Sequence, residues 1–266
     1  MKLTNRLARM IGTGLGVAAA SLALAGALAA GTTAGASTAT ARAPVATTAP
    51  VLAAYTAPAR TLRYGMTGSD VKALQQRLAA LKYYPGSANG QFGAYTLEAV
   101  WAFEEVQGLP VDGVADPKTG AALVHPRAYV ARYRSSGSTR VEVNLETRVL
   151  VLYRTNTVAL ISHISAGGGY HFCNPGGGCG YAITPKGHFR TTVYIPGWVS
   201  VPLGTMYNPV FFIDRAYAIH GESTYGPAGG GVPLNPVSHG CVRIPFAIAQ
   251  FFHTLVPTPG TSVYVY

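Results

Sequence analysis

The sequence predicts a two-domain chain, in which a small all-α domain is followed by a mostly-β domain folded as a sandwich or a partly open barrel. The first observation is a set of apolar residues at helical spacing, Val71, Leu74, Leu78 and Leu81. The second is a change of period from Val141 onward, where apolar and polar side chains alternate and β-branched residues dominate. The 266 residues are enough for two such domains with a leader and linkers.

The N-terminus has the composition of a targeting segment. Met1–Met10 carries basic residues, and an uncharged Ala/Gly/Leu run follows over Ile11–Ala30. We assign residues 1–36 to a secretory signal peptide. The alternative is an uncleaved anchor helix, since the run approaches the ~20 residues that span a bilayer. Residues 37–59 are rich in Ala, Thr and Pro, which predicts a flexible linker.

Residues 60–125 are predicted to form the helical domain. Ser69 or Asp70 is placed to cap the first helix, and Tyr83–Gly86 ends it. A second helix is expected from near Thr96 to Gly108, because a glycine is the usual residue just past a helix C-terminus.

A third, short helix is expected at Asp116–Pro117, where the aspartate is an N-cap and the proline occupies the first helical position. Residues 126–137 then form a linker to the β domain, residues 138–266. In this domain strands are predicted at Val141–Leu145, Val149–Tyr153, Val158–Ile164, Phe189–Tyr194, Val210–Ile213, Ala216–His220 and Ser262–Tyr266, and one helix at Pro245–Leu255.

The formal net charge of +10 at pH 7 does not indicate a nucleic-acid partner. Residues 1–59 hold four basic residues and no acidic ones, and the linker 126–137 adds three basic residues, whereas residues 60–125 are balanced. Because the excess lies mostly in a leader and a linker, it does not form the basic face that nucleic-acid binding needs. It is compatible with attraction to an anionic cell envelope.

The candidate active site lies in the hexapeptide Ser238–Arg243, which reads Ser-His-Gly-Cys-Val-Arg, with His220–Gly221 twenty-one positions upstream of its cysteine. A thiol with an ordinary pKa of about 8.5 needs a neighbouring base to become a nucleophile, and an imidazole supplies one. Gly240 permits a tight turn that directs backbone N–H groups toward an oxyanion. Two plainer explanations are a buried structural cysteine and a zinc-binding Cys/His pair.

Cysteine usage fits an oxidising compartment. Cys173 and Cys179 lie close together in a Gly/Pro-rich loop, so they can pair and leave Cys241 as the reactive thiol. The alternatives are three free thiols, or a metal site in which these two cysteines join His171 and His188. The sequence lacks C-x-x-C and H-x-x-x-H spacings, which disfavours the metal.

Two parts of the chain resemble known families. The β-meander, Thr184–Phe189, His220–Gly221 and Ser238–Arg243 together resemble the L,D-transpeptidase catalytic domain, also called the YkuD domain, over residues 138–266. The stretch from Leu62–Gly65 through Val71–Gln75 and Phe92–Gly93 to Leu123 resembles the peptidoglycan-binding domain type 1. The resemblances imply a peptidoglycan-binding-like helical domain followed by a mostly-β L,D-transpeptidase catalytic domain.

The first resemblance implies catalytic roles within these motifs. Cys241 is the nucleophile and His220 is the general base, because family members place the base on the upstream motif. Backbone N–H groups of Gly240 and Cys241 are the candidates for stabilising the oxyanion. His239 is the second candidate base, but we expect its side chain on the side of the chain opposite the thiol, which favours a supporting or substrate-contact role.

The remaining motif residues are expected to contact substrate. Arg243 is placed to bind a stem carboxylate, or else to brace the loop through an ion pair. Ser238 and Gly221 complete the expected substrate-binding set. Some relatives have Ser at the position of Gly221, whose backbone carbonyl orients the base, and the resemblance implies that this backbone role is kept in glycine. Residues 221–237, rich in Gly and Pro, are expected to form a lid over the cysteine. The resemblance implies neither a metal ion nor a cofactor.

Together, the resemblances imply an exported L,D-transpeptidase of cell-wall remodelling. It cleaves the bond between the third residue of a peptidoglycan stem and D-Ala at position four through a thioester, and forms 3→3 cross-links. Its expected partners are donor and acceptor stem peptides and the cell wall, with the membrane met only through an uncleaved leader. The alternatives are an L,D-carboxypeptidase on the same site and a peptidoglycan-binding protein without catalysis. The expected location is secreted and wall-associated.

Overall fold

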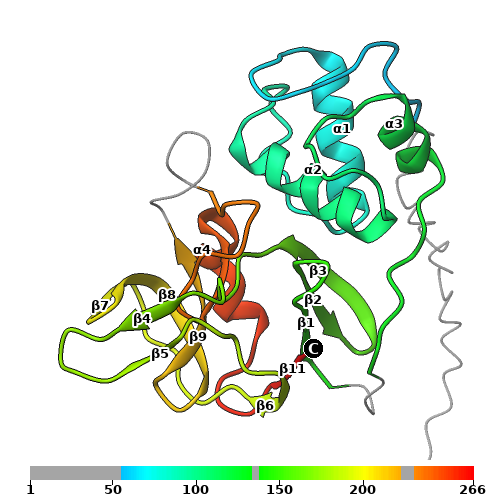
Figure 1. Cartoon of the computed structure of the whole chain (residues 1–266). Helices are drawn as coiled ribbons and strands as arrows, with labels where there is room; N and C mark the ends of the chain where they lie inside the picture. The colour runs from blue at the N-terminus through cyan, green and yellow to red at the C-terminus, as the bar shows by residue number, and fades with distance from the viewer. Residues whose placement is uncertain (1–54, 134–137, 223–230) are drawn as a thin grey trace, which may run out of the picture. The chain divides into compact units, whose positions relative to one another are not determined.

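The structure is a computed structural model that describes residues 55–133, 138–222 and 231–266 (Figure 1). The predicted signal peptide and most of the linker that follows it lie outside the described residues, as do residues 134–137 of the second linker and 223–230 of the expected lid. Residues 51–266 form one compact unit. Among the described residues, no helix has the length and apolar character needed to cross a membrane.

The first domain is helical, as the sequence predicts. Its helices are α1 (Ser69–Ala80), α2 (Ala94–Gln107) and α3 (Pro117–Val124). Leu74 and Leu78, one turn apart on α1, are fully buried and belong to the same core as Val100 and Phe103 of α2. The 3.6-residue spacing of the apolar positions therefore forms one buried stripe on α1, whereas α2 is buried on most of its faces.

The N-termini of the helices differ in how they are capped. α3 begins as predicted, because Asp116 Oδ1 accepts the Thr119 N–H at 2.8 Å. The N-cap of α1 is Gly68, and no side chain caps it. The expected cap at position 69 or 70 is wrong, because the Asp70 carboxylate pairs instead with Arg60 at 2.6 Å. The same carboxylate also accepts the Val71 N–H at 2.9 Å, so it lies at the start of α1 without being the N-cap residue.

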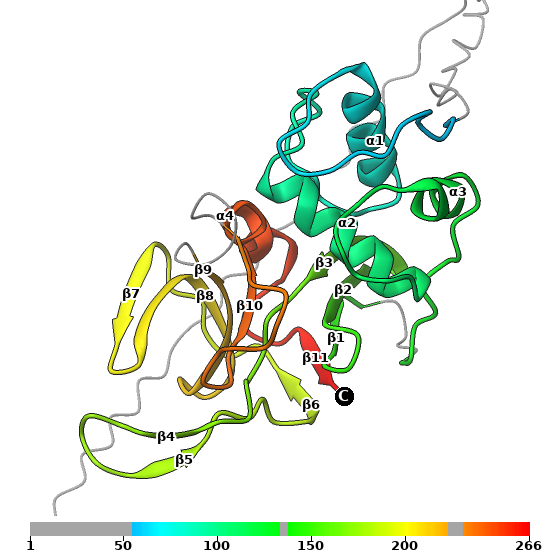
Figure 2. The same ribbon diagram turned by 45° about the horizontal axis from the view of Figure 1, so that its top comes forward.

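The second domain contains two sheets and a separate hairpin. The larger sheet has the strand order β3-β2-β1-β11-β6, the smaller one β10-β9-β8-β7, and β4 pairs with β5. The strands are β1 (Arg140–Asn144), β2 (Val149–Arg154), β3 (Thr157–His163), β4 (His171–Cys173), β5 (Cys179–Tyr181), β6 (Gly187–Arg190), β7 (Trp198–Val201), β8 (Gly204–Ile213), β9 (Tyr217–Glu222), β10 (Val242–Pro245) and β11 (Ser262–Val265). Figures 1 and 2 both show β4–β5 as an arm that extends from the rest of the domain.

The core of the β domain contains residues of both sheets and of α4 (Phe246–Leu255). Leu150 and Leu152 of the larger sheet share this core with Ile219 of the smaller sheet and Ile248 of α4. The predicted mostly-β fold is confirmed, and the predicted helix is present, with Pro245 as its N-cap. α4 lies against β8 and β9, the strands that carry one half of the candidate site.

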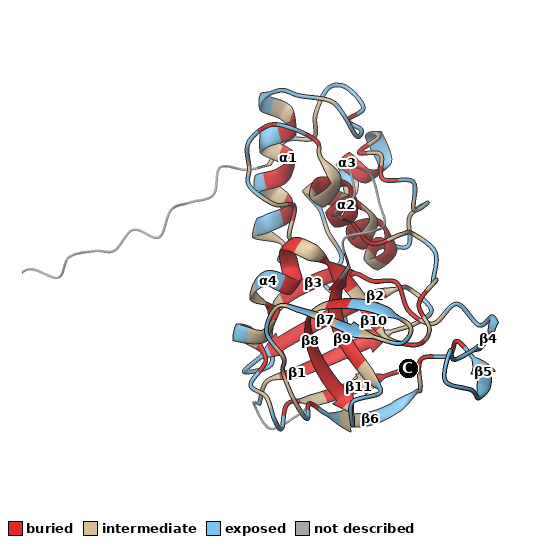
Figure 3. Cartoon of the chain, turned by 90° about the vertical axis from the view of Figure 1, so that its left-hand side faces the viewer, coloured by how far each residue is buried: buried red, intermediate tan, exposed pale blue. Residues whose placement is uncertain are grey.

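The larger sheet is buried on its other face as well. Val149, Val151 and Tyr153 of β2 belong to the same core as Val100 and Phe103 of the helical domain. A strand covered on both faces carries a continuous apolar run instead of an alternation, which is why Val149–Tyr153 is uninterrupted. Figure 3 shows β2 and β3 largely in the colour of buried residues, next to the helices of the first domain.

One predicted strand serves two sheets. The sequence predicts a single strand over Phe189–Tyr194, but β6 ends at Arg190. The Thr191 N–H donates to Thr261 O, beside the larger sheet, and the next N–H, that of Thr192, donates to Phe211 O in the smaller sheet, both at 2.8 Å. The chain therefore crosses from one sheet to the other inside an unbroken run of strand-forming residues.

Four strands have no counterpart in the sequence-based prediction. β4, β5, β7 and β10 each contain only three or four residues, which is too short for a period to be recognised. β8 in turn begins at Gly204, well before the predicted Val210, because the register shift between Tyr207 and Val210 accommodates an irregular segment within the strand. The unpredicted β10 is the strand that follows the candidate cysteine.

Candidate active site

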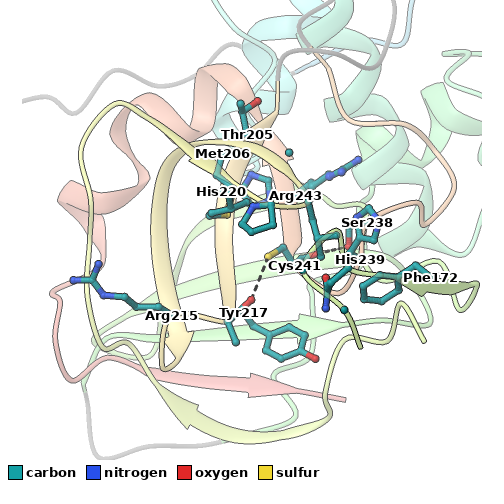
Figure 4. A pocket seen from close by; sticks show the side chains of 18 residues that line it. Phe172, Thr205, Met206, Arg215, Tyr217, His220, Ser238, His239, Cys241 and Arg243 are labelled. Carbon is teal, nitrogen blue, oxygen red and sulfur yellow. Dashed lines mark hydrogen bonds between the residues drawn. The ribbon is translucent and has the colours of Figure 1, made fainter. Parts of the chain in front are cut away.

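The parallel pairing of β9 with β10 brings the two sequence motifs together. His220 on β9 is the register partner of Arg243 on β10, and Cys241 directly precedes β10. Paired residues on neighbouring strands point to the same face of a sheet, as do residues two apart on one strand. His220, Arg243 and Cys241 therefore share one face, and all three line the same cavity (Figure 4).

The turn before Cys241 is held by the Ser238 side chain. Ser238 Oγ donates to Cys241 O at 2.6 Å and accepts the Gly240 N–H at 3.0 Å. Gly240 has a φ of 132°, a region that residues with a Cβ rarely adopt, and a Cβ there would lie 2.7 Å from Ile183 O. Thr184 Oγ1 adds a 2.8 Å bond to Gly240 O. The backbone leading to the thiol is thus fixed by side chains on both sides.

The ring of His220 is buried and has a defined tautomer. Its Nδ1 lies 2.8 Å from Gly221 O, and a carbonyl oxygen can only accept, so in the neutral ring Nδ1 carries the hydrogen. Nε2 is then the basic nitrogen, the arrangement that a general base requires. Gly221 contributes its carbonyl to the site, as the sequence predicts. A Cβ at this position would lie 2.6 Å from Ala249 Cβ, so α4 leaves no room for a side chain.

The cavity around these residues has a volume of about 520 Å³. Its apolar lining includes Val201 and Met206, near the β7–β8 turn, and Phe172 on β4. Figure 4 shows Phe172 beside His239 at one end and Arg215 at the other, with Cys241 between them. The cavity is thus a mostly apolar groove that also contains the cationic side chains of Arg215 and Arg243. Such a groove suits a substrate that carries carboxylates.

The Cys241 thiol needs help to ionise. Burial raises the pKa of the Cys241 thiol, while a hydrogen bond from the Ala218 backbone and the charge of Arg243 act in the opposite direction and do not fully offset it. The sulfur lies 4.0 Å from Ala216 O, an acceptor that stabilises the protonated thiol. A thiol in this state requires a base to take its proton, and His220 lines the same cavity.

His239 faces the cavity, and the argument from chain alternation that placed it opposite the thiol is wrong. His239 and Cys241 are two residues apart, and Gly240 between them is not in an ordinary extended conformation. The His239 ring packs edge-on against Phe172 and Tyr170, with centroid distances of 4.8 and 5.4 Å. Burial and then the Arg243 charge lower the pKa of His239, which favours the neutral ring. These contacts suit the supporting or substrate-contact role.

Two other expectations from the sequence need revision. The Gly240 N–H donates to Ser238 Oγ and is therefore not directed at an oxyanion in this structure, which leaves the Cys241 N–H as the candidate donor. Ser238, expected to contact substrate, lines the cavity, but little of it is exposed and its hydroxyl is bonded within the loop. It braces the cysteine turn instead. Arg243 lines the cavity.

Cys173 and Cys179 form a disulfide with an S–S distance of 2.02 Å, and Cys241 is the free cysteine. The disulfide closes the tip of the β4–β5 hairpin, next to the cavity-lining Phe172. His171 lies close to both sulfurs, but bonded sulfurs are not thiolates and offer a metal no charged ligand. The pairing that the sequence left open is therefore present.

Phe172 and Arg215 line the cavity and, like Val201 and Met206 of its apolar lining, were missed by sequence reasoning. Phe172 lies on the three-residue strand β4, within a Gly-rich segment, and only its contact with His239 reveals it. Arg215 stands between β8 and β9 at the cavity mouth. Its position directly before the run that leads to His220 was the available signal, since residues at the ends of strands line sites more often than those in the middle.

Known proteins match both domains. The peptidoglycan binding domain model, described as putative, matches residues 67–123, and the L,D-transpeptidase catalytic domain model matches residues 138–265. The crystal structure of an L,D-transpeptidase from Xylanimonas cellulosilytica is 36% identical, with a TM-score of 0.69 and coverage of 79% of this chain and 99% of that one.

Curated relatives match over shorter segments. A spore cortex-lytic enzyme of Bacillus cereus is 39% identical over 80 residues, which are 30% of this chain and 31% of that protein. The zinc D-Ala-D-Ala carboxypeptidase of Streptomyces albus G is 42% identical over 64 residues, which are 22% of this chain and 24% of that protein. The chain thus spans less than a third of the length of these two relatives.

Proposed function

The chain belongs to the L,D-transpeptidase family, since it covers 99% of a 36% identical member, and we propose that it forms 3→3 cross-links in peptidoglycan through a thioester on Cys241. The observation that carries this proposal is the convergence of His220 and Cys241 on one cavity, through the β9–β10 pairing. The two domains support peptidoglycan as the substrate.

The first half-reaction forms the thioester. His220 Nε2 takes the thiol proton, and Cys241 Sγ attacks the carbonyl carbon between the third stem residue and D-Ala at position four. The carbonyl oxygen becomes an oxyanion, which the Cys241 N–H is placed to stabilise. The C–N bond then breaks, the imidazolium of His220 gives its proton to the departing amine, and D-Ala leaves. The acyl group remains on sulfur.

The second half-reaction forms the cross-link. The side-chain amine of the third residue of an acceptor stem attacks the thioester carbon, and His220 takes a proton from that amine. The C–S bond breaks, an amide forms, and the thiolate leaves and is reprotonated by His220. If water attacks in place of the amine, the product is a tripeptide and the enzyme is an L,D-carboxypeptidase. The apolar wall that includes Val201 and Met206 favours the amine because it limits water at the thioester.

Mass spectrometry of the protein incubated with a disaccharide-tetrapeptide tests the proposal. We expect an acyl adduct on Cys241, release of D-Ala and formation of a cross-linked dimer, all absent in Cys241→Ala. Release of D-Ala with tripeptide as the only product would assign the carboxypeptidase activity instead. Absence of any adduct on a folded protein would contradict both enzyme proposals and leave a peptidoglycan-binding protein.

The proposed location is outside the cytoplasm, in contact with the cell wall. The disulfide between Cys173 and Cys179 supports it, because structural disulfides persist mainly in oxidising compartments. The leader composition supports it independently. The helical domain then tethers the enzyme to peptidoglycan, and no nucleic-acid partner is proposed. Fractionation of cells that produce the full chain, compared with a chain lacking residues 1–36, tests export.

A further inference from the structure

The segment that leads into the cysteine motif is bonded to α2 of the helical domain. Residues 231–237 run directly into Ser238, and Val232 in this segment is fully buried. The Val232 N–H donates to the carboxyl of Glu98, a residue of α2 that is only 2% exposed. Glu98 therefore binds backbone 134 residues away along the chain, in the other domain.

A second carboxylate of α2 reaches the next residue of this segment through a histidine. Glu105 lies 3.1 Å from His163 Nδ1, and His163 Nε2 lies 3.1 Å from Pro233 O. Glu105 also pairs with Arg148 at 3.1 Å. The buried carboxyl of Glu105 thus contacts two side chains of the β domain, His163 and Arg148.

The far end of the segment is bonded within the β domain. Ser165 Oγ donates to Asn235 O at 2.9 Å and accepts the Val237 N–H at 3.1 Å. The Ser238 N–H follows with a 2.9 Å bond to Ala166 O. Ser238 Oγ in turn holds the backbone of Cys241. Within the described residues, the hydrogen bonds that link this segment to the helical domain are those at Val232 and, through His163, at Pro233, both near the start of the segment.

We propose that Glu98, and Glu105 through His163, are positioning residues for Cys241, so that the helical domain supports the catalytic loop in addition to binding the cell wall. The inference rests on the proposed role of Cys241 as nucleophile. Loss of the Glu98 bond releases the buried Val232 N–H and with it the start of the segment that ends at Ser238. A displacement of about 1 Å at a nucleophile is enough to slow a reaction by as much as about a hundredfold.

Glu104 provides a matched control on the same helix. It is buried like Glu98, but its Oε2 accepts the N–H groups of Asp112 and Gly113, both inside the helical domain. Burial raises the pKa of both carboxyls to about 8. The two residues therefore match in type, burial and electrostatics, and differ in whether they hold the β domain.

The experiment compares Glu98→Ala, Glu98→Gln and Glu104→Ala in the full chain, by the rate of Cys241 acylation with a disaccharide-tetrapeptide. We expect Glu98→Ala to lower kcat by about ten- to a hundredfold with KM nearly unchanged. Glu98→Gln retains an oxygen that accepts the Val232 N–H and should restore kcat to within about twofold of the wild-type value. Glu104→Ala should also keep kcat within about twofold of the wild-type value, at temperatures where the variant is folded. If Glu98→Ala does not fold, Glu98→Asp, which withdraws the acceptor by one methylene, replaces it.

Two results would overturn the inference: a folded Glu98→Ala protein that acylates Cys241 at the wild-type rate, or an equal loss in Glu104→Ala. Hydrogen exchange separates this inference from the proposed function. Amides 232–241 should exchange faster in Glu98→Ala and not in Glu104→Ala, whether or not the stem peptide is the substrate. Unchanged exchange in Glu98→Ala refutes the positioning role. If the amides exchange faster in Glu98→Ala but the wild-type protein forms no adduct on Cys241, only the proposed reaction is refuted.

Discussion

The Phe172 ring packs edge-on against the His239 imidazole, with 4.8 Å between ring centroids and 76° between ring planes. This contact joins the β4–β5 hairpin to the cysteine motif, and both rings line the cavity. The residue after Phe172 is Cys173, one half of the hairpin disulfide. The hairpin therefore forms one wall of the substrate groove, and the disulfide restrains that wall.

Removal of this disulfide should weaken substrate binding more than chemistry. We expect the double variant Cys173→Ser/Cys179→Ser to raise KM for a tetrapeptide stem by about two- to tenfold, because ordering a loosened loop costs binding free energy. The value of kcat should change little. Steady-state kinetics measure both quantities. The control is alkylation of Cys241 by iodoacetamide, a reagent too small to contact the hairpin wall, whose rate should therefore be unchanged. A fall in kcat with unchanged KM would contradict this role of the hairpin.

The charge of Arg243 should set the pH at which Cys241 reacts. The guanidinium favours the thiolate and so lowers the pKa of Cys241, opposing the effect of burial. Arg243→Gln removes that contribution, so the thiol pKa should rise and the midpoint of the alkylation rate should move to higher pH. The rate of iodoacetamide alkylation against pH measures it. Arg154→Gln, an exposed arginine on β2, is the charge-matched control; equal shifts in both variants would exclude a local effect.

The parts of the structure that follow local rules were predictable. The Asp116–Pro117 pair specifies the start of α3 within four residues of sequence, and the β-branched runs specify the meander. The convergence of His220 and Cys241 was predictable from the family resemblance, since both motifs lie at fixed spacing. In each case the information that specifies the structure lies in residues adjacent in sequence, or in the motifs of a known family.

The features that sequence reasoning missed depend on contacts between distant residues. Nothing near Glu98 indicates that its carboxyl holds Val232. The crossing between sheets at Thr191–Thr192 occurs inside a run that has uniform strand propensity, so only the partners Thr261 and Phe211 reveal it. The direction of the His239 side chain depends on the unusual backbone of Gly240, which permits several conformations and so does not specify one by itself.

The buried carboxyl of Glu98 should make stability depend on pH. Its pKa is raised from an ordinary 4.5 to about 8 by burial, with a smaller opposing effect of the Val232 N–H. The unfolded chain therefore releases the proton near pH 4.5 and the folded chain only near pH 8. Between these values, each pH unit should remove up to about 1.4 kcal/mol from the free energy of unfolding.

Glu98→Gln removes this titration and should flatten the dependence. We expect the difference in unfolding free energy between Glu98→Gln and wild type to grow from pH 5 to pH 8 in favour of the variant. Chemical denaturation at a series of pH values measures it. Glu146→Gln, at an exposed glutamate in the β1–β2 turn, is the control for the substitution itself. An equal growth of its difference with pH would show that the effect is not specific to Glu98. A constant difference for Glu98→Gln would show that the carboxyl is already ionised when folded.

Gly221 should tolerate no side chain while α4 keeps its alanine. A Cβ at position 221 would lie 2.6 Å from Ala249 Cβ, well inside contact distance, so Gly221→Ala must push α4 from β9 or move the carbonyl that holds His220 Nδ1. Overpacking of this kind costs about 1–3 kcal/mol. We expect lower thermal stability and a fall in kcat. The double variant Gly221→Ala/Ala249→Gly removes the clash and should recover kcat, although glycine in a helix retains a cost of about 1 kcal/mol. Failure of the double variant to recover activity in a folded protein would assign Gly221 a role beyond close packing.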